Sequence, residues 1–293
     1  MRILYLSQYF PPEAGATQTR AYEMSRALVQ AGHQVTMLAE FPNHPSGIIP
    51  PAYRGKRYER ELLEGIDVLR VWVRASPEKN FRSRMLFYVS YMFSAILAGI
   101  FLARQPYDLI LATSPPLFAG TAGLLLSYLR RLPLVFEVRD LWPAAAVALG
   151  ELRNSTAIRL ATRLEEACYR RANKIIVVTR GMQAELEQRG IIPGKLVLIP
   201  NGANTELFDF DPGGRHSIRE ELSLEKRCVA IYAGIFGIAQ GLETILQAAQ
   251  VLREDPDFQF ILVGDGPQRR AEQWRRDDGD ENAGHHVADL RDD

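Results

Sequence analysis

Short apolar runs alternate with longer segments of mixed character along the first two thirds of the chain. The apolar runs predict strands at residues 2–7, 34–39, 68–73, 109–112, 134–138, 174–179 and 196–200. The segments between them place apolar residues at helical spacing and predict helices at 17–31, 82–104, 117–130, 154–173 and 181–190. Strands that alternate with helices are typical of βαβ units. We therefore expect a parallel, doubly wound α/β sheet with right-handed connections.

A second pattern of the same kind begins near residue 227. It predicts a strand at 227–233, a helix at 241–253 and a strand at 258–263. A doubly wound half commonly has five or six strands, yet from Gln268 onward the bulky apolar side chains are limited to Trp274, Val287 and Leu290. Such a composition buries too little surface to offset its ordering entropy. We expect a Rossmann-like N-terminal domain (1–200), an incomplete Rossmann-like C-terminal domain (201–267) and a charged tail (268–293), disordered or frame-shifted.

Composition is globular, because 47% of the 293 residues are hydrophobic and 24% are charged. The formal net charge of zero hides a basic middle: residues 79–174 hold thirteen Lys and Arg against six Asp and Glu, a net of +7. That charge could face lipid headgroups or phosphates, or belong to a solvated helix surface. Two cysteines sixty residues apart form neither a disulfide framework nor a zinc motif. We expect a reduced, cytoplasmic chain with no signal peptide, no metal and no nucleic-acid partner.

One segment, Met85–Ala103, contains no charged residue, and arginines stand on both sides of it at 82, 84 and 104. A membrane span needs about 20 apolar residues, so its length is borderline. Three interpretations remain open: a core helix, a helix lying in the membrane interface with its arginines at headgroups, and a true span. The flanking segments look like parts of one α/β domain, which argues against the span.

Two stretches at the carboxyl ends of predicted strands are candidate binding loops. QYFPPEAGATQTRA (8–21) turns through Gly15 into a helix, whose first amides suit an anion such as a phosphate; a plain βα turn is the alternative. FPNHPSGIIPP (41–51) carries His44, which could act as an acid, a base or a binding group, or simply be exposed. In doubly wound folds, ligands bind at this edge of the sheet.

FEVRDLWP (136–143) is the sharpest candidate for chemistry. An apolar strand there ends in the adjacent charged pair Arg139 and Asp140. Asp140 could accept a hydroxyl proton, orient a substrate or cap the following helix. We take both residues as catalytic candidates.

Glycine turns at three further strand ends suit the close approach of a phosphate. They lie in IPNGAN, YAGIFGIAQGLE and VGDGP. The candidate phosphate- and ligand-binding residues in these turns are Asn201, Gly202, Gly234, Gly237, Gln240, Glu243, Gly264, Asp265 and Gly266. Glu243 could instead be ordinary first-turn helix charge.

Taken together and in this order, these motifs resemble the family-4 retaining glycosyltransferases of the GT-B fold. YFPPEAGATQTRAYEMSRAL, FPNHPSGIIPP, TSPP, FEVRDLWP, IPNGAN, YAG…GLE and LVGDGP carry the resemblance, which covers residues 1–267. Among these enzymes the chain is most similar to the bacterial O-antigen and capsule subgroup that includes N-acetyl-L-fucosamine transferases.

The resemblance implies two Rossmann-like domains that face each other across a cleft. It implies transfer of a sugar from a nucleotide-diphosphate sugar, expected to be a UDP-sugar, to a polyprenyl-diphosphate-linked saccharide. That reaction needs no cofactor and usually no metal. It also implies that Gly15 lies by the sugar phosphate, that Asp140 lies near the reacting centre, and that the enzyme is peripheral at the inner face of the membrane.

The chain departs from the family pattern at two places. Many members hold the diphosphate with an Arg and a Lys where this chain has Ile235 and Gln240. The family's E-x7-E pair is missing from the tail, where Glu272 is followed by Asp280. These departures predict an impaired, truncated enzyme. The alternatives are an inactive module that binds acceptor and membrane, and a UDP-sugar epimerase of the same fold.

Overall fold

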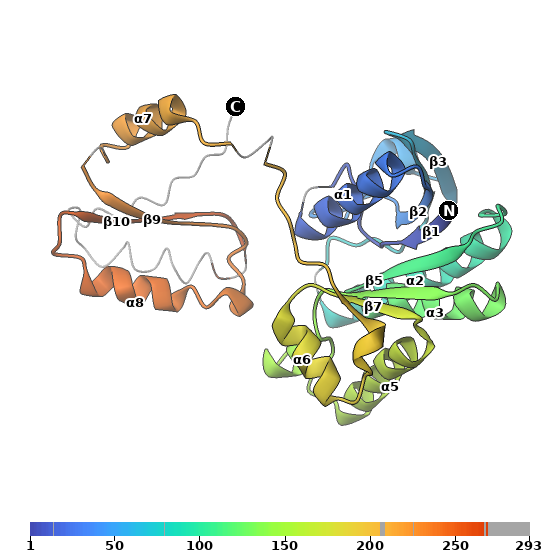
Figure 1. Cartoon of the computed structure of the whole chain (residues 1–293). Coiled ribbons are helices and arrows are strands. Elements are labelled where there is room, and N and C mark those ends of the chain that lie inside the picture. Colours follow the sequence, from blue (N-terminus) through green and yellow to red (C-terminus); the bar gives the residue numbers. More distant parts are fainter. Residues whose placement is uncertain (14, 79, 206–208, 225, 267, 269–293) are drawn as a thin grey trace. The chain divides into compact units, whose positions relative to one another are not determined.

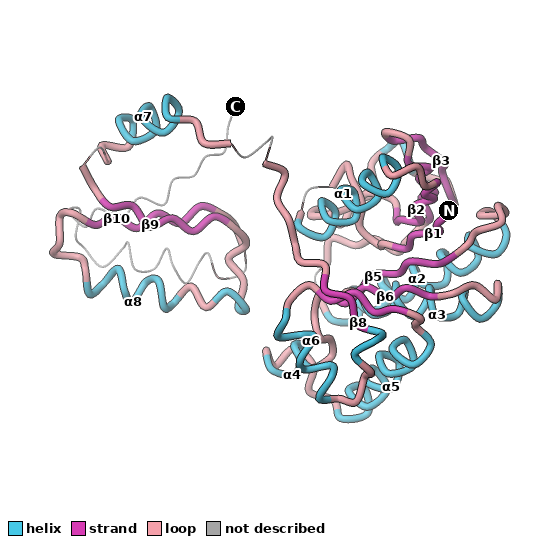
Figure 2. The backbone as a smooth tube through the Cα atoms, viewed as in Figure 1, coloured by secondary structure: helices cyan, strands magenta, loops and turns pink. Residues whose placement is uncertain are grey.

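The computed structural model describes residues 1–266 and 268, apart from residues 14, 79, 206–208 and 225. The chain divides into two compact units, Met1–Gly202 and Ala203–Asp293. Figure 1 follows the chain from the N-terminus to the C-terminus, and Figure 2 shows which segments are helix and which are strand. The predicted tail from 269 onward lies outside the described residues.

The first unit is built on an eight-stranded sheet in the order β3-β4-β2-β1-β5-β6-β7-β8. All neighbouring pairs are parallel except β3 and β4, which are antiparallel. The strands are β1 (Arg2–Leu6), β2 (Gln34–Glu40), β3 (Tyr58–Leu63), β4 (Ile66–Val71), β5 (Leu109–Ser114), β6 (Leu134–Val138), β7 (Lys174–Val177) and β8 (Leu196–Leu198). The predicted doubly wound α/β fold is confirmed.

Helices cover both faces of this sheet, because its strands are apolar on both sides. They are α1 (Ala16–Gln30), α2 (Phe81–Phe101), α3 (Leu117–Leu129), α4 (Ala144–Ala148), α5 (Ser155–Arg171) and α6 (Arg180–Gln188). Apolar side chains of α1 pack with Tyr5 and Met37 on one face, whereas α2, α3, α5 and α6 contribute to a larger core with Leu4 and Phe136 on the other. In Figure 1, α1 and α5 lie on opposite sides of the strands.

The antiparallel strand β3 was not predicted from the sequence. Its polar and apolar residues alternate as YERELL, and its side chains are alternately exposed and half-buried. A weak alternation of this kind is what an edge strand shows when only one face packs. Glu64 and Gly65 form the tight turn into β4 with positive φ angles of 46° and 83°.

Helix α2 is partly a core helix and partly exposed. Tyr91, Ala95, Ala98 and Gly99 are buried against the sheet and α3, and the Tyr91 hydroxyl donates to the backbone oxygen of Leu38 at 2.7 Å. By length and composition alone the helix could cross a membrane, but only 22% of its apolar window is buried. Phe87, Met92 and Ile96 are partly buried against the core, whereas Leu86, Phe93, Leu97 and Ile100 are exposed.

The second unit, where it is described, has the parallel pair β9 (Cys228–Ala233) and β10 (Phe258–Val263). Helices α7 (Pro212–Glu221) and α8 (Glu243–Val251) accompany them. Phe236, Leu242 and Leu262 are its buried apolar cluster. Ile231 at 64% and Val251 at 82% exposure show how little of this unit's apolar surface is covered in the described residues.

Candidate functional site

A cavity of about 200 Å³ opens at the carboxyl edge of the first sheet. The segments that follow β1, β5 and β6 reach it through Tyr9, Pro115 and Trp142, because parallel strands all end at that edge. Helix α2 closes the opposite wall with Met85 and Tyr88. The cavity is therefore built by chain segments that are distant in sequence and that the sheet brings together.

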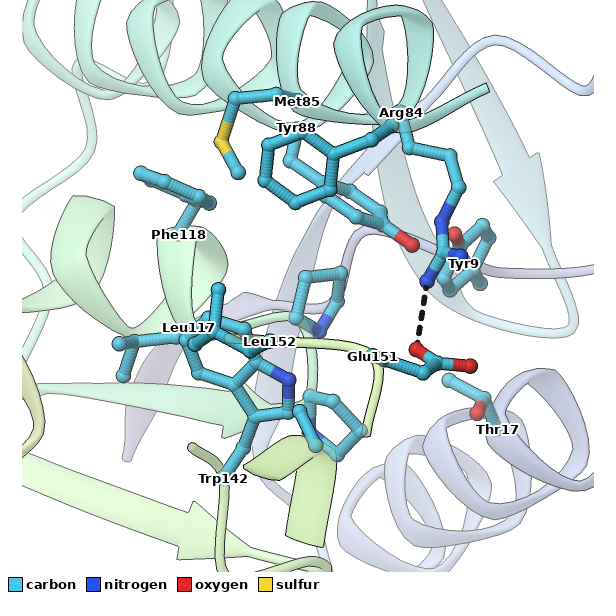
Figure 3. A pocket seen from close by; sticks show the side chains of 14 residues that line it. Tyr9, Thr17, Arg84, Met85, Tyr88, Leu117, Phe118, Trp142, Glu151 and Leu152 are labelled. Carbon is cyan, nitrogen blue, oxygen red and sulfur yellow. Dashed lines mark hydrogen bonds and ion pairs between the residues drawn. The ribbon is translucent and has the colours of Figure 1, made fainter. Parts of the chain in front are cut away.

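The cavity has an apolar, largely aromatic lining and a charged entrance. In Figure 3 the rings of Trp142, Phe118 and Tyr88 surround it, and the Arg84 guanidinium meets the Glu151 carboxylate at 3.3 Å. Arg84 and Glu151 are half exposed, at 50% and 46%. Exposed ion pairs of this kind contribute about 0–1 kcal/mol, so the pair can open at little cost.

Beyond the ion pair lies a second hollow of about 550 Å³. Phe81, Glu151 and Leu152 line both hollows. The Arg84–Glu151 pair therefore stands where the two meet. Separation of this pair would leave a cation beside a longer apolar depression, which suits an anionic group attached to an apolar or saccharide chain.

The catalytic candidates Arg139 and Asp140 follow β6 at this same edge. Arg139 does not line the cavity; its Nη2 donates at 2.8 Å to the backbone oxygen of Pro115, which does. Burial lowers the pKa of Arg139, although neighbouring Glu137 opposes the shift. Arg139 therefore supports the cavity wall rather than reaching into it.

Asp140 is exposed and lies two residues before Trp142. Partial desolvation raises the pKa of its carboxyl above the usual value, and Arg139 partly offsets this. Helix α4 is capped by Pro143 with no side-chain cap bond from the described residues, so Asp140 does not cap that helix. Of the three roles open for Asp140 in the sequence, proton acceptance and substrate orientation remain.

Loop 41–51 is fixed by a carboxylate that the sequence did not point to. Glu13, 7% exposed, accepts hydrogen bonds from the backbone amides of Asn43 at 2.5 Å and His44 at 2.6 Å. The exposed His44 ring makes an edge contact with the Tyr9 ring, centroids 6.2 Å apart. His44 is thus connected to the cavity through Tyr9, and Glu13 sets its place.

Glu40 is buried in the same cluster. Its two carboxyl oxygens accept from the side chains of Gln8 at 2.7 Å and Asn43 at 2.8 Å. Burial raises the pKa of Glu40 well above the usual value, and the nearby Glu13 adds to the shift. Because two carboxyls share one buried cluster, the neutral form of Glu40 is favoured.

A second network anchors the predicted residues Asn201 and Gly202. Arg20 of α1 pairs with the buried Glu137 of β6 at 2.8 Å. The same guanidinium donates to the backbone oxygens of Ile199 and Pro200 and to the Asn201 side chain, at 2.9–3.0 Å. Asn201 therefore lies next to Arg20, and Gly202 follows it at the end of the first unit.

Gly15 is the N-cap of α1 and has a φ of 153°, which a side chain would strain. A Cβ there would lie 2.6 Å from the Gln18 side-chain oxygen. The glycine is thus needed for the backbone of this turn. Whether it contacts a sugar phosphate stays a prediction.

In the second unit, the structure brings the predicted glycine turns together at the carboxyl ends of β9 and β10. The Phe236 amide donates to the Asp265 backbone oxygen at 2.9 Å. A side chain on Gly264 would meet the backbone oxygen of Gly234, and one on Gly266 would meet that of Phe236. Gly237, Gln240 and Glu243 continue this turn: the first two cap and end a 3-10 turn, and Glu243 begins α8.

Several cavity residues were not predicted individually. Tyr9 and Trp142 lie inside the motifs singled out in the sequence, and Arg84 flanks the uncharged segment. By contrast, no sequence signal connects Glu151 with Arg84 or Glu137 with Arg20. Among the described residues, no group of three or more His, Cys, Asp or Glu could hold a metal ion.

The doubly wound sheet, together with a second unit that starts with glycine-rich strand-to-helix turns, defines a Rossmann-like α/β protein of the GT-B type. The chain belongs to the family described as "Glycosyl transferase 4-like domain", which matches residues 15–202.

Two curated relatives carry glycosyltransferase names. The chain is 25% identical over 272 residues to the putative colanic acid biosynthesis glycosyl transferase WcaI of Escherichia coli K12, a match covering 91% of this chain and 66% of the relative. It is 29% identical over 195 residues to the probable glycosyltransferase WbjE of Pseudomonas aeruginosa, covering 65% and 48%. The chain therefore spans two thirds or less of the length of these relatives.

Among solved structures, the chain is similar to Anabaena HepE in complex with UDP-glucose. The TM-score is 0.60 at 20% identity, and the match covers 94% of this chain and 65% of that one. At this identity the similarity establishes the fold alone.

Proposed function

We propose that the chain carries the acceptor-binding half and the start of the donor-binding half of a retaining glycosyltransferase. The reaction moves a sugar from a UDP-sugar to a lipid-linked saccharide in the synthesis of a surface polysaccharide, such as O-antigen or capsule. The observation that carries this proposal is the aromatic cavity with Arg84 at its entrance, in a chain of the glycosyl transferase 4-like family. The N-acetyl-L-fucosamine subgroup is the finer assignment that the sequence motifs favour.

On the donor side, the paired glycine turns of the second unit support binding of a nucleotide diphosphate. Gly234 and Gly264 leave the backbone free of side chains where the two turns meet, and backbone amides in such turns bind phosphate. Solved proteins of this fold bind UDP or UDP-glucose. A UDP-sugar is therefore the donor that we propose.

On the acceptor side, aromatic walls fit the apolar faces of sugar rings, and Arg84 fits a phosphate oxygen of the lipid diphosphate. In the free protein the Arg84 guanidinium is paired with the Glu151 carboxylate. An incoming diphosphate would replace Glu151 with a doubly charged partner. This exchange would make the site selective for acceptors that carry a phosphate.

Asp140 is the residue that we propose near the reacting centre. The acceptor hydroxyl oxygen bonds to the anomeric carbon as the bond from that carbon to the diphosphate breaks. A carboxylate with a raised pKa is a better proton acceptor, so Asp140 is suited to orient or accept the hydroxyl proton. The same placement would serve an epimerase, but membership in a glycosyl transferase family favours transfer.

Such acceptors reside in membranes, so we propose a location at the cytoplasmic face of the cell membrane. The outward apolar surface of α2 and the arginines around it support this location.

Binding is the direct test, because the chain spans only part of its relatives. We expect UDP and UDP-glucose to bind in saturation-transfer NMR, with NAD⁺ as the unrelated nucleotide. We expect Gly264→Val to abolish this binding, because its side chain would meet the Gly234 backbone oxygen. Gly194→Ala, in open space, is the control. Equal signals for NAD⁺ would refute the donor assignment.

For the acceptor, polyprenyl-diphosphate N-acetylglucosamine should change the fluorescence of Trp142. Arg84→Gln should weaken this binding about 10-fold, the value of one charged hydrogen bond. Arg163→Gln, an exposed arginine of α5, should leave it unchanged. Unaltered affinity in Arg84→Gln would show that the cavity is not the acceptor site.

A further inference from the structure

We propose that the groove between α2 and the β3–β4 hairpin binds one anionic lipid of a bilayer, with α2 lying along the membrane interface. The groove measures about 580 Å³, within the roughly 300–1,000 Å³ of small-molecule sites. This inference rests on the membrane location proposed above. It adds the surface that contacts the bilayer, the orientation of α2 along the interface, and the lipid that binds.

One stripe of α2 is apolar and uncovered. Leu86, Phe93, Leu97 and Ile100 recur at helical spacing, with exposures of 46%, 58%, 56% and 38%. They share a face because residues 3, 4, 7 and 11 apart lie on one side of a helix. Side chains of this size are seldom left exposed in a row unless something covers them.

Positive charge stands at both ends of the stripe. Arg82 is exposed in the first turn of α2, and Arg104 is exposed just after its end. The helix itself contains no Asp or Glu. An apolar stripe with arginines at its ends matches a bilayer interface, where the apolar side chains enter the acyl region and the cations stay at the headgroups.

The opposite face of α2 is tied to the protein. The Tyr91 hydroxyl donates to the Leu38 backbone oxygen. Arg130, the residue after α3, donates from its guanidinium to the Gly99 backbone oxygen at 2.9 Å. These contacts keep the helix on the sheet. The geometry therefore fits a helix that lies on the membrane and not one that crosses it.

The groove gives this surface a specific ligand site. Leu97 and Phe101 of α2 form one wall, and Tyr58 of β3 and Trp72, the residue after β4, form the other. Trp72 is 45% exposed and Phe101 is 56% exposed. These four side chains offer an apolar slot that is continuous with the stripe through Leu97.

Cations border the slot without a carboxylate among its lining residues. Arg57 is exposed and makes no ion pair with any residue described, whereas Lys56 pairs with Glu59 at 2.7 Å. A lipid with an acyl chain in the slot would place its phosphate beside Arg57. Charge complementarity thus favours an anionic headgroup.

The groove and the acceptor cavity use different parts of the same helix. The cavity takes Phe81, Arg84, Met85 and Tyr88 from the first two turns, and the groove takes residues from Ser94 onward. A lipid in the groove would therefore hold α2 at the membrane while its first turns remain free for the acceptor.

Trp72 can report on this site directly. With Trp142 and Trp274 changed to Phe, Trp72 is the sole tryptophan of the full chain. We expect vesicles of phosphatidylglycerol brominated on the acyl chain to quench its fluorescence strongly. The matched chain that keeps only Trp142 should be quenched much less, because Trp142 lines the acceptor cavity.

Two substitutions test the contacts. Arg57→Gln should weaken binding to phosphatidylglycerol vesicles about fivefold at low salt, the effect of one surface cation, with Arg163→Gln as the exposed control. Leu97→Glu should abolish quenching of Trp72. Leu160→Glu, on the 61% exposed Leu160 of α5, should not.

The outcomes separate the inference from the location on which it rests. No vesicle binding at low salt would overturn both. Vesicle binding without quenching of Trp72 would overturn the groove site and leave the membrane location standing. A dimer in sedimentation that Leu97→Glu dissociates, with vesicle binding unchanged, would show that a second copy covers the stripe, and would also overturn the proposal.

Discussion

Arg20→Met should be among the most destabilising single changes in the first unit. Arg20 and Glu137 form an ion pair whose side chains are only 10% and 1% exposed. Methionine keeps the length and apolar stem of arginine but removes its charge. Glu137 would then remain buried with the Tyr5 hydroxyl, 3.3 Å away, as a hydrogen-bond partner and with the charge of the neighbouring Arg139 as partial compensation.

The magnitude follows from this burial. Removing one partner of a buried ion pair typically costs about 3–5 kcal/mol, because the remaining charge is uncompensated. For a unit of about 200 residues, each kcal/mol lowers the melting temperature by about 2–4 °C. We therefore expect a loss of about 6–20 °C.

The assay is thermal and urea unfolding followed by circular dichroism, with Arg26→Met as the matched control on the same helix. Arg26 is 35% exposed and its pairs with Glu23 and Glu64 are 3.7 and 3.6 Å long. Its loss should cost no more than about 0.5 kcal/mol. Arg20→Met/Glu137→Gln should lose less than the sum of the single changes, because the Glu137 carboxylate charge is removed together with its ion-pair partner.

Limited proteolysis separates the contacts of Arg20 with the segment after β8 from its effect on the stability of the whole unit. Arg20 also holds the backbone oxygens of Ile199 and Pro200. Arg20→Met should therefore speed thermolysin cleavage between residues 199 and 205 at temperatures well below unfolding. A loss in Arg20→Met no greater than that in Arg26→Met, with unchanged cleavage, would refute this account of the network.

Three further predictions concern buried groups. Burial raises the pKa of Cys168 to about 12, so we expect a disulfide reagent at pH 8 to modify one thiol quickly, and Cys228→Ser to remove that reaction. Burial raises the pKa of Glu40 in the folded state, so the folded state keeps a proton that the unfolded state releases, and the free energy of unfolding falls as pH rises above about 4.5. Glu40→Gln should flatten this pH dependence in urea unfolding. An unchanged dependence would assign it to another group. A Cβ at Gly120 would lie 2.5 Å from a ring carbon of Phe136, so Gly120→Ala should cost about 1–3 kcal/mol, whereas Gly194→Ala, in open space, should be neutral in the same measurement.

The loops that reach the candidate site could be located from sequence, because ligand loops follow strand ends, but Gly15, His44, Arg139 and Asp140 do not line the cavity. The apolar run 134–138 ends where the charged pair and Trp142 begin, and Tyr9 follows the first strand. Parallel strands bring such ends to one edge. The partners across the cavity could not be predicted this way, since Arg84 meets Glu151 across 67 positions of chain.

The sequence by itself determined the order and type of the elements. Strands buried on both faces must be apolar throughout, and helices that pack on them must be apolar at helical spacing, so local pattern encodes both. It also determined that α2 carries no charged residue after Arg84. The edge strand β3 was not predicted from this pattern because it packs on one face only and its alternation of polar and apolar residues is weak.

Only the tertiary structure decided which polar groups are buried together. Arg20 and Glu137 are 117 positions apart, and Glu13 reaches Asn43 across 30. Likewise, α2 is uncharged and mostly apolar after its first turn, and only its packing decides that Tyr91 faces the core while Phe93 faces outward. A residue's local sequence fixes its side-chain chemistry and the spacing along its helix. The register of strands and the docking of helices fix which partner, or which solvent, that side chain meets.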